Sequence, residues 1–262
     1  MNLQLKNRIA LVCGGSSGLG FAVAEGLLAE GARIALNGRD TGKLDRAVAA
    51  LRKQGGDAQA FAADVASDTA CAALVEQVHQ TMGGPDIVLC NSGGPPAGGF
   101  ESHPASAWQT ALDTSLLSAV HLSRAAVPHM RAAGWGRILC LTSVAARQPS
   151  ASLILSTTAR AGVLGFCKAL SDEVAAVGIT VNVLCPGYFG TERLQELAEV
   201  RGRAAGKSAS EVLTEMGQAV PIGRIGIPAE FAAAAVFLAS EPARYITGTV
   251  LGVDGGLTRS IL

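Results

Sequence analysis

Short apolar runs rich in Val, Ile and Leu recur along the chain and alternate with longer segments of helical pattern. The runs are apolar throughout rather than at every second residue, which is typical of strands that are covered on both faces. Because parallel strands are joined by helices that cross over on the sheet faces, this alternation predicts one α/β domain over residues 1–262. The expected architecture is a doubly wound, seven-stranded parallel sheet with helices on both faces. The seven runs are RIALVCG, ARIALNG, DAQAFAAD, PDIVLCNS, GRILCLTS, GITVNVLCPG and GTVLGVDGG.

Several segments between the runs have recognisable helix ends. Each is closed by a glycine, the residue that most readily takes the left-handed conformation after a helix. One segment is irregular: about 187–226 carries two short helical patterns with mixed charge, and we expect it to form a lid over a ligand cleft. The clearest helices are 21–30 before Gly31, 43–53 before Gly55 and 68–82 before Gly83.

Composition narrows the classes of partner. Apolar residues make up 49% of the chain and charged residues 16%, and Lys+Arg equal Asp+Glu at 21 each. Such a chain can bury a large core and has no net charge to draw it to nucleic acid or an anionic membrane. IALVC is too short for a secretory signal, and no stretch reaches the roughly 18 apolar residues of a membrane span. The six cysteines form no CxxC pair and the four histidines are scattered, so no metal site is predicted. We expect a cytoplasmic protein that binds a small molecule.

The first apolar run ends in CGGSSGLG, directly before a helical pattern. A tight glycine turn lets the backbone approach a pyrophosphate, and the helix N-terminus offers it unpaired N–H groups and a positive dipole. A turn at this place in the first strand–helix unit favours dinucleotide binding over a purely structural role. The candidate cofactor residues in the turn are Gly14, Ser16, Ser17, Gly18, Leu19 and Gly20.

The whole chain resembles the short-chain dehydrogenase/reductase family. The turn has that family's GxxxGxG spacing, and further matches follow in order: DV at 64–65, CNSG at 90–93, TSVA at 142–145, PGYFGT at 186–191 and YITGTVLGVDGG near the end. The resemblance implies a Rossmann-type sheet, a nicotinamide dinucleotide cofactor and the interconversion of a carbonyl compound and an alcohol. Within the family, the 3-oxoacyl-acyl-carrier-protein reductase-like group is the best match. The resemblance also assigns these residues to the cofactor: Asp64, Val65, Asn91, Ser92, Gly93, Arg160, Pro186, Gly187 and Thr191.

The end of the second apolar run indicates which dinucleotide is bound. In the family, an acidic residue there holds the adenosine ribose of NAD, whereas a basic residue just after it accepts the 2′-phosphate of NADP. Here Gly38 takes the place of the acid and Arg39 follows, and a guanidinium can pair with a phosphate through two hydrogen bonds. We therefore favour NADP(H), with NAD(H) as the alternative. In the purely structural interpretation, Arg39 is a solvated loop residue and Asp40 or Thr41 caps the next helix.

The catalytic positions depart from the family pattern. The family uses a serine on the fifth strand, a tyrosine thirteen residues later, a lysine one helical turn further on and an asparagine on the fourth helix. Ser143 matches the serine, whereas Ser156, Arg160 and Ser115 replace the other three. A phenol has a pKa of about 10, which a neighbouring ammonium can lower, whereas serine is a poor acid and arginine keeps its proton. Arg160 retains a positive charge for the cofactor, so the tetrad is degenerate in its acid–base half.

Other groups could donate the proton that the family's tyrosine would supply. Tyr188, just after CPG, would lie near the nicotinamide in this family, although packing on the cofactor or the lid is its simpler role. A water held by Ser143, Ser156 and Thr157 is another source, and Arg147 either faces an anionic substrate group or is a solvated cation. We therefore predict an oxidoreductase with an atypical active site and low activity. The alternative is a non-catalytic dinucleotide-binding protein with a regulatory or scaffolding role.

The expected partners are an apolar small molecule and further copies of the chain. The family resemblance implies a homotetramer in which the long fourth and fifth helices pair across one two-fold axis and residues 248–262 pack across another. The stretches LLSAVHLSRAAV and AGVLGFCKAL are more apolar than helices with one solvated face, which agrees with such pairing. Side chains that suggest an apolar carbonyl or alcohol substrate are Leu153, Leu155, Phe189 and Leu194.

Overall fold

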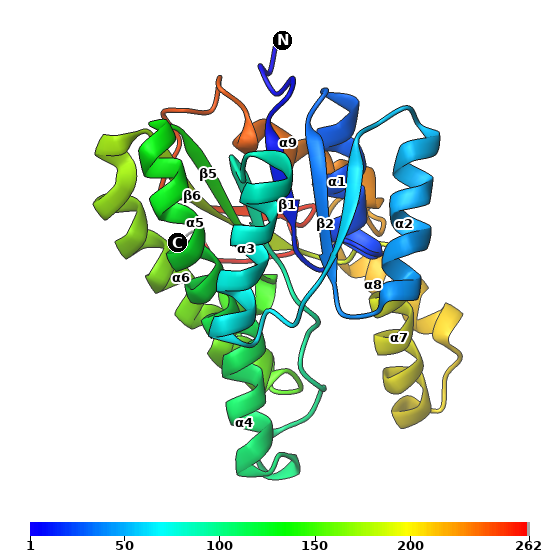
Figure 1. Cartoon of the computed structure of the whole chain (residues 1–262). Coiled ribbons are helices and arrows are strands. Elements are labelled where there is room, and N and C mark those ends of the chain that lie inside the picture. Colours follow the sequence, from blue (N-terminus) through cyan, green and yellow to red (C-terminus); the bar gives the residue numbers. More distant parts are fainter. Residues whose placement is uncertain (261–262) are drawn as a thin grey trace.

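A seven-stranded sheet forms the centre of the molecule, in a computed structural model that describes residues 1–260 (Figure 1). The strands are β1 (Ile9–Val12), β2 (Arg33–Gly38), β3 (Ala58–Ala62), β4 (Ile87–Cys90), β5 (Gly136–Leu141), β6 (Ile179–Pro186) and β7 (Val250–Val253). Their order across the sheet is β3-β2-β1-β4-β5-β6-β7, and every neighbouring pair is parallel. The predicted parallel sheet is therefore confirmed. Because the order reverses between β1 and β4, a crevice opens at the carboxyl ends of these strands.

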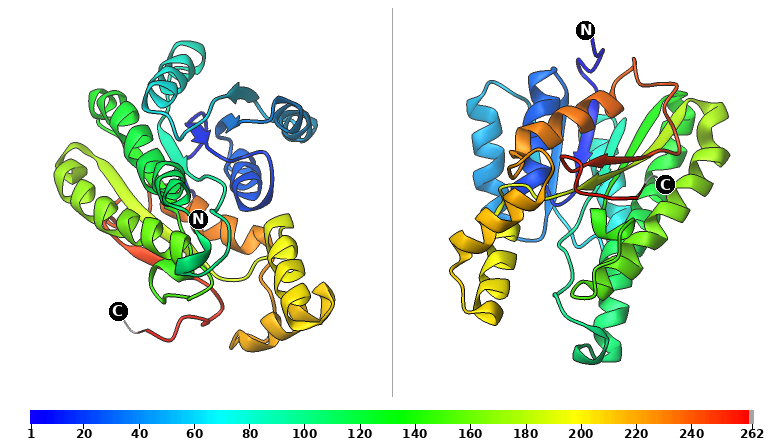
Figure 2. Two further views of the ribbon diagram at one scale, coloured as in Figure 1. Left: turned by 90° about the horizontal axis from the view of Figure 1, so that it is seen from below. Right: turned by 180° about the vertical axis from the view of Figure 1, so that it is seen from behind.

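Helices cover both faces of the sheet, as Figure 2 shows. They are α1 (Gly18–Ala29), α2 (Thr41–Lys53), α3 (Asp68–Met82), α4 (Ala105–Leu112), α5 (Ser118–Ala133), α6 (Ile154–Val174), α7 (Glu192–Ala205), α8 (Ala209–Ala219) and α9 (Pro228–Ala239). One apolar core joins α1, α2 and α9 to the sheet, and a second joins α3, α5 and α6 to its other face. Helices α7 and α8 pack on each other around a small apolar cluster of their own. Among residues 1–260, no helix combines the length and the apolar character needed to cross a bilayer.

The predicted helix ends follow from local chemistry. Gly83 directly follows α3, and Gly31 and Gly55 lie one residue further beyond the ends of α1 and α2. Their φ values are 93°, 84° and 85°, the left-handed conformation that glycine adopts without a steric penalty. At the start of α2, the carboxylate of Asp40 accepts a hydrogen bond of 2.9 Å from the backbone N–H of Lys43. Asp40 is thus the N-cap of α2, which satisfies one of the unpaired N–H groups of its first turn.

One arginine is buried at the edge of the core. Arg137 on β5 is 1% exposed, and its guanidinium lies 4.1 Å from the ring centre of Trp135. Its Nη2 lies 3.1 Å from Oε2 of Glu241, which also accepts a hydrogen bond from the indole N–H of Trp135. The guanidinium of Arg8 stacks on the same ring at 3.8 Å. A buried cation is tolerated only when it is paired and hydrogen-bonded, so this cluster fastens β5 to the segment after α9.

All six cysteines are free thiols and all are buried. Burial raises the pKa of Cys71 to about 12 and the pKa of Cys13 well above its ordinary value. These thiols are small core side chains held in their neutral form. Within residues 1–260, no group of three or more His, Cys, Asp or Glu side chains is placed to bind a metal. The cysteines are Cys13, Cys71, Cys90, Cys140, Cys167 and Cys185.

Candidate functional site

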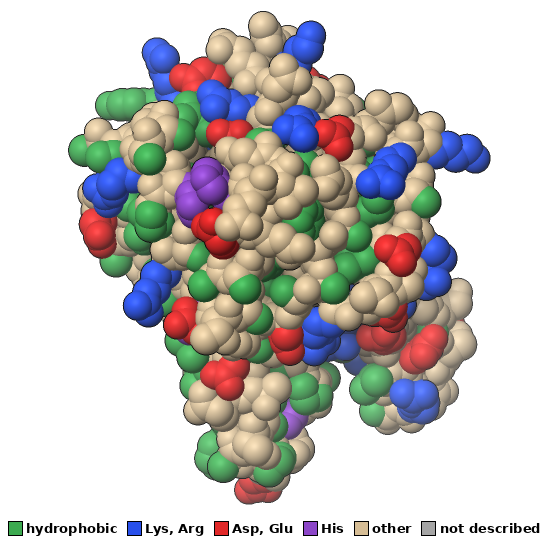
Figure 3. Space-filling model, viewed as in Figure 1, with side chains coloured by type: hydrophobic (Ala, Val, Ile, Leu, Met, Phe, Trp, Pro, Cys, Tyr) green, Lys and Arg blue, Asp and Glu red, His purple; other side chains and the backbone are tan. Residues whose placement is uncertain are grey.

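The carboxyl ends of the central strands open into a cleft of about 1580 Å³. Helix α4 lines one side of it and α7 the other, and Figure 3 shows this face hollowed between the α4 lobe and the α7–α8 lobe. The cleft coincides with the reversal of strand order, where open α/β sheets bind their ligands. All the residues that the sequence assigned to a cofactor line it: Gly14, Ser16, Ser17, Gly18, Leu19, Gly20, Arg39, Asp64, Val65, Asn91, Ser92, Gly93, Arg160, Pro186, Gly187 and Thr191.

The glycine turn after β1 has a backbone that only glycines allow. Gly14 and Gly18 have φ of 57° and 58°, and a Cβ on Gly20 would clash with the carbonyl oxygen of Gly14. The side-chain amide of Asn91 donates hydrogen bonds of 3.2 Å to the carbonyls of Cys13 and Gly14, which fastens the turn to the end of β4. No side chain of residues 1–260 caps the first turn of α1. A glycine-rich turn, followed by a helix whose first turn is uncapped, fits a pyrophosphate group.

At the far end of the cleft, β2 ends at Gly38 beside the glycine turn. The last residue of β2 is a glycine, so this position carries no carboxylate. A Cβ on Gly38 would lie 3.6 Å from Oγ of Ser16, which shows how close the strand end is to the glycine turn. Arg39 is exposed, lines the cleft and has no hydrogen bond or ion pair within residues 1–260. The carboxylate of Asp40 is occupied as the cap of α2. The end of β2 therefore offers the cleft the positively charged side chain of Arg39 and no carboxylate that is free to bind a ligand.

Two of the replaced catalytic residues are in direct contact. Arg160 Nη1 donates a hydrogen bond of 2.5 Å to Oγ of Ser156, one turn earlier on α6. Ser156 is 4% exposed and borders the cleft, as does Ser143, whose Oγ accepts a hydrogen bond of 3.1 Å from the N–H of Ala145. Since Ser143 and Ser156 both accept in these contacts, each hydroxyl keeps its own hydrogen to donate toward the cleft.

A second arginine lies beside Arg160. Where Gly94 would carry a Cβ, that point lies 3.5 Å from Arg160 Nη2 and 3.8 Å from Arg193 Nε. Arg193, in the first turn of α7, also donates to the carbonyl of Pro95 at 3.0 Å and pairs with Glu196 at 3.2 Å. Burial, and then the like charge of Arg193, lower the pKa of Arg160 to about 10. Within the described chain Arg160 has no ion-pair partner, so its charge is uncompensated.

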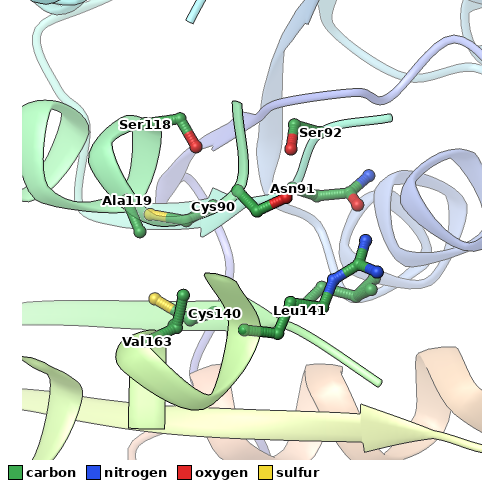
Figure 4. A pocket seen from close by; sticks show the side chains of 10 residues that line it. Cys90, Asn91, Ser92, Ser118, Ala119, Cys140, Leu141 and Val163 are labelled. Atoms are coloured by element: carbon green, nitrogen blue, oxygen red, sulfur yellow. The ribbon is translucent and has the colours of Figure 1, made fainter. Parts of the chain in front are cut away.

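Ser115 does not line the main cleft. It lies in a π-helical turn, Asp113–Leu117, between α4 and α5, and its buried Oγ has no hydrogen-bond partner among the described residues. It borders a separate cavity of about 10 Å³, which Arg160 also lines. That is roughly the volume a single water needs. Figure 4 shows the labelled side chains around this cavity, which are Cys90, Asn91, Ser92, Ser118, Ala119, Cys140, Leu141 and Val163.

Several alternative groups lie differently from what the sequence suggested. Tyr188 lines the cleft, but it also packs against the apolar cluster of α7 and α8. Arg147 is not part of the cleft wall, and its positive charge acts on Asp254 after β7. Thr157 is also absent from the wall. Leu155 is 1% exposed and belongs to the interior, because α6 turns this position away from the ligand side. Three of the four expected apolar residues do line the cleft: Leu153, Phe189 and Leu194.

Arg193 is a charged cleft residue that the sequence did not predict. It belongs to no motif, and the fold alone brings α6, α7 and the loop after β4 together at Gly94. The only available signal was its position two residues after Thr191, in the first turn of a helix that follows a predicted cofactor segment.

Comparisons with known proteins agree with this geometry. The family model described as Enoyl-(Acyl carrier protein) reductase matches residues 14–258. D-beta-hydroxybutyrate dehydrogenase of Cupriavidus necator is 32% identical over 254 residues, which cover 97% of this chain and 98% of the relative. The 3-oxoacyl-[acyl-carrier-protein] reductase FabG of Pseudomonas aeruginosa is 33% identical over 258 residues, which cover 98% of this chain and 100% of the relative. Among solved structures, L-sorbose reductase from Gluconobacter frateurii, complexed with NADPH and L-sorbose, has a TM-score of 0.95 and 33% identity, with 100% of both chains covered.

Proposed function

The chain belongs to the short-chain dehydrogenase/reductase family, and on that premise we propose that it is an NADP(H)-dependent oxidoreductase that interconverts a carbonyl compound and its alcohol. One observation carries the proposal: every residue assigned to the cofactor from the sequence lines a single cleft at the reversal of strand order. The two family members and the NADPH-bound L-sorbose reductase support it, since each covers nearly the whole chain.

The residues present fit a dinucleotide. The glycine-rich turn from Gly14 to Gly18 and the uncapped start of α1 would hold the pyrophosphate. Arg39 would pair with a 2′-phosphate, because it is exposed at the cleft and Gly38 puts no carboxylate in its way. Thr191 lies against the turn, with its methyl 3.6 Å from the point where Gly18 would carry a Cβ. When bound, NADP(H) supplies or accepts the hydride.

The polar residues at the other end of the cleft would act on the substrate oxygen. Ser143 would donate its hydroxyl hydrogen to the carbonyl, and Ser156 is placed to add a second donor, because its Oγ already accepts from Arg160. Arg160 would stabilise negative charge on that oxygen but would not release a proton. We therefore propose that this site orients and polarises its substrate well and transfers protons poorly, which gives low activity on simple ketones.

Residues 187–226 would act as the lid of this site. Helices α7 and α8 stand out from the sheet beside the cleft (Figure 2). Arg193 of α7 donates a hydrogen bond of 3.0 Å to the carbonyl of Pro95 in the loop after β4. An apolar substrate body would contact Leu153, Phe189 and Leu194 beneath the lid.

Titration of both cofactors tests the proposal. NADPH should bind about 10- to 150-fold more tightly than NADH, because hydrogen bonds to a charged group contribute about 1.5–3 kcal/mol. Arg39→Ala should remove most of this preference. Arg131→Ala, which removes an exposed arginine at the end of α5, serves as the control and should keep it. Equal affinities in the wild type, or a preference that survives Arg39→Ala, would show that the NADP assignment is wrong.

A panel of carbonyl compounds separates the enzyme from its alternative. Loss of NADPH absorbance with any member of the panel supports the oxidoreductase. Tight NADPH binding with no turnover across the panel, in either direction of the reaction, would instead support a non-catalytic dinucleotide-binding protein.

A further inference from the structure

We propose that Arg160 and Arg193 form a subsite for an anionic group of the substrate, and that the substrate is an oxo acid, a carbonyl compound that also carries a carboxylate. The inference rests on the proposed function, because the subsite lies in the same cleft. It goes beyond that function by naming the chemical class of the substrate. The carboxylate is a handle for binding and does not take part in the hydride transfer.

The two guanidinium groups reach one place from different helices. Arg160 comes from the second turn of α6 and Arg193 from the first turn of α7, and both line the cleft. The Cβ position of Gly94 lies 3.5 Å from Arg160 Nη2 and 3.8 Å from Arg193 Nε. Both guanidinium groups therefore lie close to the bare Cα of Gly94. An anionic group that binds against this glycine would have two charged donors near it.

The charges at this place do not balance within the described chain. Among residues 1–260, the only side-chain hydrogen-bond partner of Arg160 is the neutral hydroxyl of Ser156. Arg193 pairs with Glu196 through Nη1, and Nη2 binds a backbone carbonyl, so its Nε remains toward Gly94. Glu192 is the other carboxylate of α7 at the cleft, and it also borders the hollow near Ser16 and Lys43 at the cofactor end. Two cations held side by side in a partly buried site repel each other, and an anion between them relieves that cost.

The proposed cofactor does not supply this anion. Its phosphates are accounted for at the glycine turn and at Arg39, whereas its nicotinamide end carries ribose hydroxyls and no negative charge. A neutral ketone would likewise leave both guanidinium groups uncompensated. A carboxylate matches the paired N–H donors of a guanidinium, and the apolar walls at Leu153 and Phe189 suit a short hydrocarbon body. An oxo acid combines these two parts.

Matched pairs of acids and esters test the subsite. We would measure binding of acetoacetate and methyl acetoacetate, and of 2-oxobutanoate and its methyl ester, by calorimetry. NADP⁺ is used in place of NADPH so that no ketone is reduced during the titration, and each titration is repeated without dinucleotide. In the wild type the acid should bind about tenfold or more tightly than its ester.

The variants isolate the contribution of Arg193. Arg193→Gln should bring the acid–ester ratio close to one while NADP⁺ affinity stays unchanged, and Arg193→Lys should restore part of the ratio. Arg203→Gln removes an exposed arginine in the last turn of the same helix, away from the cleft, and should keep the wild-type ratio. The side chain of Arg193 is 54% exposed, so its replacement should leave the fold intact, which a thermal melt checks.

Two kinds of failure are distinguishable. If NADP⁺ binds but acid and ester bind equally in the wild type, or Arg203→Gln lowers the ratio as much as Arg193→Gln, the subsite is refuted and the proposed cofactor stands. If NADP⁺ does not bind at all, the proposed function is refuted. In that case the acid–ester ratio measured without dinucleotide still decides the subsite.

Discussion

Restoring the family's proton donor should increase ketone reduction. The variant is Ser156→Tyr with Arg160→Lys, which places a phenol and an ammonium one helical turn apart on α6. The contact of 2.5 Å between the present side chains demonstrates that these positions meet on one face of the helix. A positioned general acid contributes about 10²–10⁴-fold in rate, equivalent to roughly 3–5 kcal/mol of barrier. The double variant should gain a rate increase in that range on uncharged ketones, with a serine already available at position 143.

The structure also predicts the order of the intermediate variants. Ser156 is only 4% exposed, but its hydroxyl borders a cleft of about 1580 Å³ into which a phenol can extend. Ser156→Tyr alone should gain less, because Arg160 occupies the adjacent space and keeps its proton. Crowding of this kind costs about 1–3 kcal/mol. Adding Ser115→Asn to the double variant should raise the rate further if a water beside Arg160 limits proton supply.

The assay is NADPH oxidation with a panel of uncharged ketones at matched cofactor saturation. Ser156→Ala is the companion variant: it should lower any wild-type ketone reduction, because it removes one of the two proposed hydroxyl donors to the substrate oxygen. A wild type that already turns over at about 1–10³ s⁻¹ and loses this activity in Tyr188→Phe would refute the reasoning. In that case the proton donor would be Tyr188, and the site would not be weakened.

Three further predictions concern stability and assembly. Glu241→Ala should lower the free energy of unfolding by about 3 kcal/mol in urea denaturation, because it leaves Arg137 buried without its carboxylate; an unchanged midpoint would contradict the pairing. The hydrogen bond from Trp135, and then the charge of Arg137, hold the pKa of Glu241 below its ordinary 4.5, so its contribution is present above that pH and lost as pH falls through the lowered value. The wild type should therefore lose its stability advantage over Glu241→Gln on acidification, and a constant difference would be the contrary result. Light scattering at micromolar concentration should give the mass of a tetramer, and a monomer mass would refute this. The expected interfaces are formed by α5 and α6, the helices expected to pair from LLSAVHLSRAAV and AGVLGFCKAL, and by residues 248–262, of which 261 and 262 lie outside the described residues.

Local chemistry explains why much of the fold and cofactor site was predictable. The spacing of Gly14, Gly18 and Gly20 predicts their turn. Glycines such as Gly83 mark helix ends, because they adopt a left-handed conformation that other residues avoid. Continuous apolar runs predict buried strands, and β1, β4 and β6 are buried along their whole length. The edge strands β3 and β7 are only partly buried. These signals are carried by neighbouring residues, so they can be recognised without knowledge of the tertiary structure.

The rest of the site depends on contacts between distant segments. Leu155 was expected beside the ligand. The packing of α6 determines which side of this helix faces the cleft, and Leu155 is not on that side. Ser115 lies in a π-helical turn that no sequence pattern predicts, and its buried hydroxyl has no hydrogen-bond partner among the described residues. The pairing of Arg160 with Arg193 at Gly94 arises only when three separate elements meet.

The rate at which the buried cysteines are chemically labelled would report how often the unaltered protein opens. Six thiols lie in the interior, and burial holds those such as Cys71 in the neutral form, so an alkylating reagent should react with them only when the chain opens. A ligand that binds only the folded chain, present at about 100 times its Kd, stabilises it by roughly 2.7 kcal/mol and slows labelling through global unfolding about 100-fold. Labelling rates can therefore rank dinucleotides, oxo acids and esters in the unaltered protein, including compounds that it binds without converting.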